Sequence, residues 1–161
     1  MDRLTVIDMF CGAGGFSEGF RQQGYEIKLG VDYWEPAIKT FNHNFSLNCS
    51  VKNMLDFEHS IEEIEKLPDS DIIIGSPPCV TFSSSNISGK ADKTSGVTLT
   101  QIFLRIVAVK KWKPNSILKA WFMENVPSSI KHLGNEYTFD ELGLGDWATK
   151  HKIGRTKVAI K

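Results

Sequence analysis

Cysteine is scarce in this 161-residue sequence, which has three cysteines and no C-x-x-C pair. The odd count excludes a closed disulfide framework, and the spacing is not that of a structural zinc site, so we expect no metal. Long apolar runs are also missing: no stretch approaches the roughly 18 residues that cross a membrane, and the first residues lack the order of a signal peptide. These absences predict an intracellular protein without membrane contact, cytoplasmic in a bacterium or nuclear in a eukaryote.

Neither charge sign is in excess, because 19 Lys and Arg balance 19 Asp and Glu. The two halves differ: residues 1–80 hold 6 basic and 13 acidic residues, and residues 81–161 hold 13 and 6. Two interpretations stay open for the lysines of the second half, contact with a polyanion or the solvated C-terminal end of a helix. The cluster consists of Lys110, Lys111, Lys113 and Lys119.

Apolar segments alternate between strand-like and helix-like patterns. Short apolar runs, β-branched in the first of them, predict strands at 4–10, 26–31, 71–75, 120–123 and 156–160. Helical spacing or capping predicts helices near 16–20, at 37–43, 60–67 and 99–112, and weakly at 138–149. This order predicts one α/β domain with a mostly parallel sheet and helices on both faces.

Three loops rich in Gly, Pro, Cys and acidic residues follow predicted strands, at 10–16, 75–83 and 124–127. In a parallel sheet the carboxyl ends of the strands share one edge, where ligands bind. The loops are therefore expected to converge on one cleft. The long polar stretch between Cys79 and Leu99 is predicted to be a functional loop at the same edge.

The first loop has the features of a nucleotide site. Its glycines allow a tight turn before a helix N-terminus, and Asp32, twenty residues after Gly12, can accept a hydrogen bond from a ribose hydroxyl. Tyr33 and Trp34 can stack on adenine or pack in the core. Residues 4–20 contain no Lys or Arg to neutralise a dinucleotide's phosphates. A cofactor with a carboxylate and a sulfonium fits this loop better than a dinucleotide does.

The second and third loops carry a thiol and a carboxyl group. Pro77 and Pro78 fix the backbone before Cys79, which places its thiol on a stiff turn at the mouth of the cleft. Glu124 follows an apolar strand, where desolvation would favour its neutral, proton-donating form. Cys11 and Cys49 lack such a setting and are expected to be structural.

Three motifs together resemble those of the cytosine-5 DNA methyltransferase family: DMFCGAGGFS at 8–17, GSPPC at 75–79 followed by Phe82-Ser83, and ENVP at 124–127. The resemblance implies a Rossmann-like S-adenosylmethionine-dependent methyltransferase fold and DNA methylation of the restriction-modification type. It implies cofactor contacts from Phe10, Gly12, Gly14, Gly15, Asp32, Tyr33, Asn53, Pro77 and Leu99. Asp32 would bind ribose and Tyr33 would stack on adenine. Asn53 stands where the family usually has an Asp that touches the adenine amino group.

The resemblance also implies a reaction on double-stranded DNA. Cys79 would add to C6 of a cytosine flipped out of the duplex, while Glu124 supplies a proton or hydrogen bond at N3. The activated C5 would then take the methyl group. Further substrate contacts would come from Pro78, Ser83 and Asn125. Residues 80–98 would close over the base, with Lys90 and Lys93 near phosphates.

The sequence departs from the family in its last part. No Gln-x-Arg-x-Arg segment and no target-recognition domain follow Pro127. Residues 1–161 are therefore expected to be a partial catalytic domain, incomplete at its C-terminus, that needs a complementary C-terminal subunit or segment and is inactive alone. Three alternatives stay open: an inactive S-adenosylmethionine-binding fragment, a nicotinamide or flavin oxidoreductase, and an RNA cytosine methyltransferase acting on tRNA.

Overall fold

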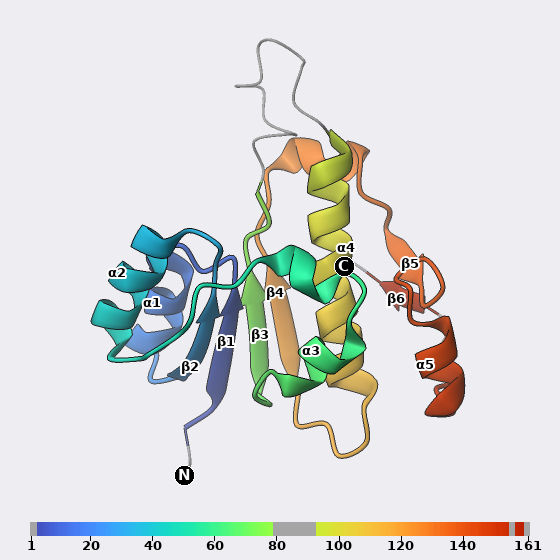
Figure 1. The fold of residues 1–161 in the computed structure, drawn as a ribbon, viewed down its shortest axis with the longest axis horizontal. Helices are drawn as coiled ribbons and strands as arrows, with labels where there is room; N and C mark the ends of the chain where they lie inside the picture. Colours follow the sequence, from blue (N-terminus) through green and yellow to red (C-terminus); the bar gives the residue numbers. More distant parts are fainter. Residues whose placement is uncertain (1–2, 79–92, 155–156, 160–161) are drawn as a thin grey trace.

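The computed structural model describes residues 3–78, 93–154 and 157–159. Its main sheet has the order β2-β1-β3-β4, and each neighbouring pair is parallel (Figure 1). The strands are β1 (Thr5–Met9), β2 (Glu26–Val31), β3 (Ile72–Gly75) and β4 (Ala120–Met123). The helices beside this sheet are α1 (Gly15–Gln22), α2 (Glu35–Phe45), α3 (Ile61–Lys66), α4 (Lys93–Trp112) and the 3-10 turns η1 (Met54–Phe57) and η2 (Pro127–Lys131). The predicted α/β fold with a parallel sheet is confirmed.

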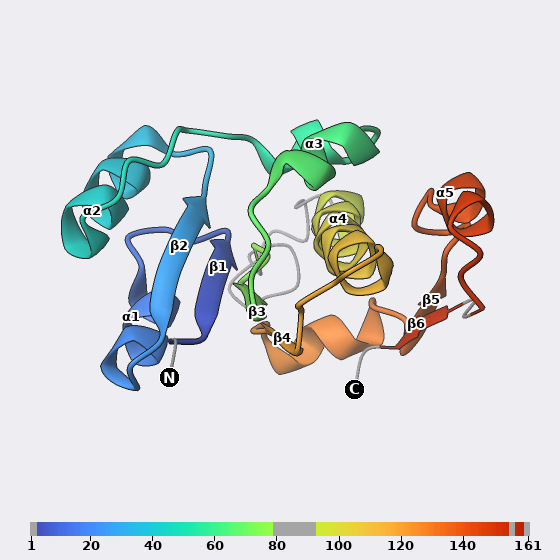
Figure 2. The same cartoon turned by 90° about the horizontal axis from the view of Figure 1, so that it is seen from below.

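The two faces of the sheet are covered by different helices, as the alternation of side chains requires. Val6 and Ile74 belong to one apolar cluster, with Phe41 of α2. Ile7, which follows Val6, and Ile73, which precedes Ile74, belong to the second cluster. This cluster contains most of the buried residues of α4. Figure 2 shows α1 and α2 at one side of the molecule and α3 and α4 at the other. Four short strands thus form the centre of two cores.

Helix α4 begins earlier than the sequence predicts. Residues 93–98, expected to belong to a loop, form its first turns. Further along, Phe103 and Val107 are fully buried, in agreement with the apolar spacing. The short acidic helix α3 is also confirmed, because Ser60 Oγ accepts a hydrogen bond from Glu63 N at 3.2 Å as an N-cap should.

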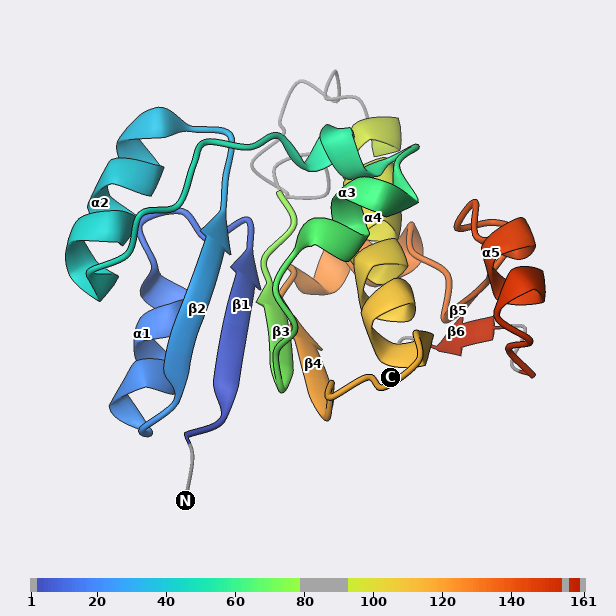
Figure 3. The ribbon, with the colours of Figure 1, turned by 60° about the horizontal axis from the view of Figure 1, so that its bottom comes forward.

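The predicted fifth strand does not join the main sheet. Strand β6 (Lys157–Ala159) pairs antiparallel with β5 (Glu136–Thr138) in a separate two-stranded sheet. This pair, with helix α5 (Gly145–Lys150), lies beyond α4 from the main sheet (Figures 2 and 3). A strand of three residues, Lys-Val-Ala, does not specify its partner strand, which is why the sequence pattern misplaced it.

The lysine cluster lies at the amino end of the strands, opposite the predicted cleft, and is committed to intramolecular contacts. Lys110 is 3% exposed, and its ammonium donates to Leu67 O and to Asp69 at 3.1 Å. Lys113 also pairs with Asp69, Lys119 pairs with Asp71 at 2.7 Å, and Lys111 donates to Leu118 O. A freely solvated Lys110 is therefore wrong, while contact of this cluster with a polyanion stays a prediction.

The lengths and compositions of the helices bear on membrane insertion. Across the described ranges, no helix is both long enough and apolar enough to pass through a lipid bilayer.

Candidate cofactor and active site

The carboxyl ends of the four strands line up in register. Val31 of β2 pairs with Met9 of β1, Met9 pairs with Gly75 of β3, and Gly75 pairs with Met123 of β4. The loops that follow these residues therefore leave the sheet at one edge (Figure 3). The predicted convergence of the loops is confirmed for their described parts. Because β2 and β3 lie on opposite sides of β1, this edge is also the switch point where α/β sheets bind ligands.

A cavity of about 440 Å³ opens at this switch point. Five residues predicted to touch the cofactor line it: Phe10, Asp32, Tyr33, Asn53 and Leu99. Pro78, predicted to touch the substrate, lines it as well. Sequence reasoning missed four further lining residues, Met54, Leu55, Ser76 and Gly96.

The glycine loop is fixed by the carboxylate of Asp32. Gly12 N donates to Asp32 Oδ2 at 3.0 Å, and Trp34 N donates to Asp32 Oδ1 at 2.9 Å. Phe10 has a left-handed φ of 62°, which turns the chain at the end of β1. Asp32 thus ties the end of β1 to the end of β2 while its outer lone pairs stay free to accept from a ligand.

The remaining residues predicted at the cofactor do not line the cavity. Gly14 has φ 99° and packs under α2, where an added Cβ would lie 2.3 Å from Phe45 Cε2. Its small size therefore serves packing of the loop on α2. Gly12 belongs to the same loop, Gly15 is the first residue of α1, and Pro77 is buried.

The third loop carries Glu124 directly after β4. Glu124 N donates to Gly75 O at 3.0 Å, which continues the pairing of β4 with β3. Its side chain is exposed, so the desolvated setting expected from the apolar strand is wrong. Asn125 Oδ1 accepts from Val126 N at 2.8 Å, and its Nδ2 is buried without a hydrogen-bond partner among the described residues. The predicted nucleophile Cys79 and the predicted substrate contact Ser83 lie outside the described residues.

Comparison with known protein families shows which family this sequence matches. Residues 4–142 match the family described as C-5 cytosine-specific DNA methylase. The chain belongs to this family. The match covers all three loops and the whole main sheet of this methylase.

Bacterial relatives share much of this methylase chain. The type II methyltransferase M.HgiGI of Herpetosiphon aurantiacus is 40% identical over 125 residues, which cover 76% of this chain and 90% of that protein. M.HgiDI of the same organism is 39% identical, and M.HindV of Haemophilus influenzae is 38% identical. The matched segment spans only 37% of M.HgiDI and 38% of M.HindV.

Solved structures agree on the fold of the methylase. A prophage-encoded protein of E. coli, described as a DNA modification methyltransferase, has 26% identity and a TM-score of 0.56 over 92% of this chain. The S. pombe Dnmt2 methyltransferase has 16% identity and a TM-score of 0.51 over 78% of it. The chain covers 36% and 35% of these two structures. The sheet and its helices are thus those of S-adenosylmethionine-dependent methyltransferases.

Below the glycine loop lies a buried acid that has no cation beside it among the residues that the structure describes. Asp8 is 1% exposed, its Oδ2 accepts from Ser17 Oγ at 2.7 Å, and its Oδ1 has no partner. Burial and, to a smaller extent, the charge of the nearby Asp32 raise the pKa of Asp8 to about 7, although the hydrogen bonds with Ser17 act in the opposite direction. Burial also raises the pKa of the Cys11 thiol, which fits the structural role predicted for this cysteine.

A measurable pH dependence follows from Asp8. Because its pKa is about 7 in the folded state, against 3.8 for an ordinary aspartate, the folded protein binds the proton more tightly than the unfolded chain does. The free energy of unfolding should therefore fall as pH rises from about 4 to about 7, on the order of a few kcal/mol, and then level off. Asp8→Asn should remove this fall. Urea unfolding at several pH values would check it, and equal pH profiles for both proteins would contradict it.

Proposed function

We propose that this chain binds S-adenosylmethionine and contributes the catalytic thiol for methylation of cytosine C5 in double-stranded DNA. The observation that carries the proposal is the cavity at the switch point, next to the Pro78 turn that precedes Cys79. The ten described lining residues include one charged side chain, Asp32, and no Lys or Arg. Such a wall suits a sulfonium cofactor and disfavours the phosphates of a dinucleotide.

The cavity residues fit the parts of this cofactor. The Asp32 carboxylate would accept from the ribose hydroxyls, and Tyr33, which is 69% exposed at the rim, offers an open aromatic face for adenine. Phe10 and the backbone of the glycine loop would hold the methionine part, and Leu99 of α4 would cover the opposite side. The bound cofactor supplies an electrophilic methyl group.

The proposed chemistry uses the loops on either side of the cavity. The Cys79 sulfur forms a bond to cytosine C6, and Glu124 donates a hydrogen bond or proton at N3, which makes C5 nucleophilic. After C5 gains the methyl group, its proton leaves, the bond from C6 to sulfur breaks with its electron pair going to the Cys79 sulfur, and any proton placed on N3 returns to Glu124, which restores the aromatic ring. The described strands support this pairing, because Gly75 and Met123, which precede the two loops, are register neighbours.

The hydrogen bonding of Asn53 leads to a prediction about its proposed contact with adenine. Its Oδ1 accepts from Leu55 N at 3.0 Å as the N-cap of η1, so a ligand is offered one neutral lone pair of Oδ1 and the donor Nδ2. The adenine amino group needs an acceptor. Asn53→Asp should therefore strengthen S-adenosylmethionine binding about threefold to tenfold by adding an ionised acceptor, while stability stays equal because Asp and Asn cap similarly.

Calorimetry on the two proteins would check this prediction. Adenosine is the useful control ligand, because it keeps the adenine and loses the methionine part, so the gain should be the same for both ligands. An unchanged affinity with an unchanged melting temperature would place the adenine amino group away from Asn53.

We also infer that residues 1–161 supply the cofactor half and catalytic loop, while target recognition comes from a complementary C-terminal segment or subunit. The matched segment covers little more than a third of M.HgiDI and M.HindV. Among the described strands, β4 pairs only with β3, and Phe122 on this edge strand is 47% exposed. An open edge and an exposed aromatic ring are suited to receive further polypeptide. The chain alone should then be inactive, and act where DNA lies, in the bacterial cytoplasm or a nucleus.

Isothermal titration tests the cofactor part of the proposal on the chain as it is. S-adenosylmethionine should bind with one site per chain, and NAD should not bind. Preference for NAD would favour an oxidoreductase and overturn the proposal. Steady methylation of cytosine DNA by the isolated chain would separately overturn the need for a complementary part.

A further inference from the structure

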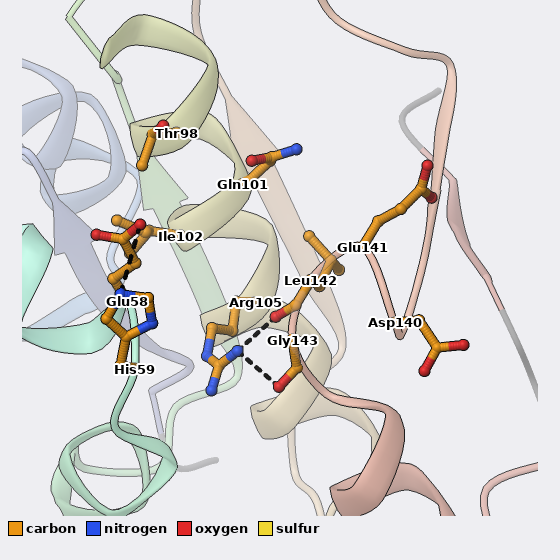
Figure 4. Close-up of a pocket in the computed structure, with 10 residues that line it drawn as sticks. All are labelled: Glu58, His59, Thr98, Gln101, Ile102, Arg105, Asp140, Glu141, Leu142 and Gly143. Atoms are coloured by element: carbon orange, nitrogen blue, oxygen red, sulfur yellow. Dashed lines mark hydrogen bonds and ion pairs between the residues drawn. The ribbon is translucent and has the colours of Figure 1, made fainter. Parts of the chain in front are cut away.

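A second cavity, of about 350 Å³, lies beside the cofactor cavity along the same two elements. Where Gly96 and Leu99 of α4 line the first cavity, Gln101 and Arg105 line the second, further along the helix. The end of η1 and the segment before α5 form its other walls (Figure 4). Neither the proposed cofactor nor the proposed base uses this space.

The cavity contains a buried cation without an anionic partner. Arg105 is 6% exposed, its Nη1 donates to the carbonyl oxygens of Leu142 and Gly143, the second at 2.8 Å, and its Nε is buried with no partner. Among the described residues, no carboxylate forms an ion pair with it. Burial lowers the pKa of this guanidinium, and the charge of Glu58 partly offsets the effect. A buried charge normally has a partner of opposite sign, because desolvation is costly without one.

The acidic side chains around the cavity do not serve as this partner. Glu141 accepts from the backbone and side chain of Thr138 at 2.7 and 2.8 Å. In Figure 4 the Asp140 and Glu141 side chains point away from Arg105. Glu58 lies on the opposite wall, 3.8 Å from His59 Nε2. Arg105 is thus held in place through Nη1, and the Nε–H donor of its guanidinium has no acceptor among the described residues.

We propose that this cavity binds a carboxylate group, which pairs with the free side of the Arg105 guanidinium. A carboxylate matches the planar fork of an arginine, and one negative charge is enough to neutralise it. A phosphate dianion would find only one Lys or Arg, Arg105, among the described lining residues, so its second charge would stay unpaired and be repelled by Glu58 on the facing wall. The carboxylate can come from a small organic acid or from an acidic side chain of another polypeptide segment, and the two sources are distinguishable.

The test follows the Arg105 Nε–Hε signal in spectra of the ¹⁵N-labelled chain. The signal is assigned by its loss in Arg105→Lys, and acetate is added at constant ionic strength against chloride. Acetate should shift the signal saturably, and inorganic phosphate should bind more weakly. A capped aspartate, N-acetyl-aspartate N-methylamide, separates the sources: tighter binding than acetate indicates a polypeptide carboxylate, and equal binding indicates a free acid.

Two variants make the result decisive. Arg105→Lys keeps the charge and loses the fork, so acetate affinity, measured on neighbouring amide signals, should fall about tenfold. Glu58→Gln leaves the Arg105 contacts in place and should raise acetate affinity about twofold to fivefold by removing the facing charge. Shifts equal to those of chloride, tighter binding of phosphate, or an unchanged affinity in Glu58→Gln would each overturn the proposal. None of these outcomes depends on cofactor binding.

Discussion

Replacing Cys79 with serine is expected to abolish covalent capture of cytosine DNA, a loss of about 1,000-fold or more in adduct yield. A hydroxyl is far less acidic than a thiol, so serine cannot supply the anion that adds to C6 at neutral pH. The suitable protein is a chimera in which this chain replaces the matched segment of M.HgiDI, to which it is 39% identical. In DNA containing 5-fluorocytosine, fluorine at C5 blocks the last elimination, so the adduct survives denaturing electrophoresis.

The other cysteines give a matched control for this prediction. Cys49 is 9% exposed, and its sulfur accepts from Gly30 N at 3.3 Å, a contact that a serine hydroxyl can retain. Cys49→Ser should therefore trap DNA like the unchanged chimera. Cys79→Ser should keep its affinity for S-adenosylmethionine, which separates a lost nucleophile from a lost fold. An adduct of normal yield in Cys79→Ser would place the nucleophile on another residue.

The parallel sheet was predictable because its strands are buried on both faces. Short β-branched runs such as Ile72-Ile73-Ile74 have no polar face, which is typical of central parallel strands, and their bounds agree with the structure within about two residues. The cleft followed from the topology, since loops after parallel strands must share an edge. Asp32 followed from its place at the end of the second strand, twenty residues after Gly12, and Asn53 from the family resemblance; the cavity places both on its wall.

Other parts of the site carried no pattern that sequence reasoning could detect. Gly96 enters the cavity wall through a helical turn of polar residues, where Thr100 Oγ1 donates back to Gly96 O at 3.0 Å. The sequence of such a turn predicts a loop, because its residues lack the apolar spacing of a helix. Lys110 was expected to contact a polyanion or solvent, and Arg105 was not singled out, yet both are buried by segments distant in sequence. Their environment depends on tertiary contacts that composition does not encode.

The largest change in the free energy of unfolding is expected from a substitution at the contact between β3 and α4. An added Cβ at Gly75 would lie 2.6 Å from Phe103 Cε2 and 2.9 Å from Met9 O, and Phe103 is fully buried. Gly75→Ala should therefore force β3 away from β1 and lower the free energy of unfolding by about 2–3 kcal/mol, with Gly75→Val worse. The same displacement would strain the hydrogen bond from Ser76 N to Met9 O, now 3.3 Å, and so weaken cofactor binding.

Two variants show whether crowding at this contact is the cause. Gly19→Ala makes the same chemical change in α1, where an added Cβ meets nothing within 4 Å, and should raise stability by about 0.5–1 kcal/mol through helix propensity. Phe103→Leu should recover part of the loss in Gly75→Ala, because the smaller side chain relieves one of the two contacts, while the fixed Met9 carbonyl keeps the recovery incomplete. Urea unfolding of the unchanged chain, Gly75→Ala, Gly19→Ala and the double variant with Phe103→Leu measures each effect. If Gly75→Ala unfolds at the same urea concentration as the unchanged chain, then β3 and α4 are not packed as closely as the structure places them. The wall that positions Pro78 and Leu99 around the cofactor would then be looser than the proposed site requires.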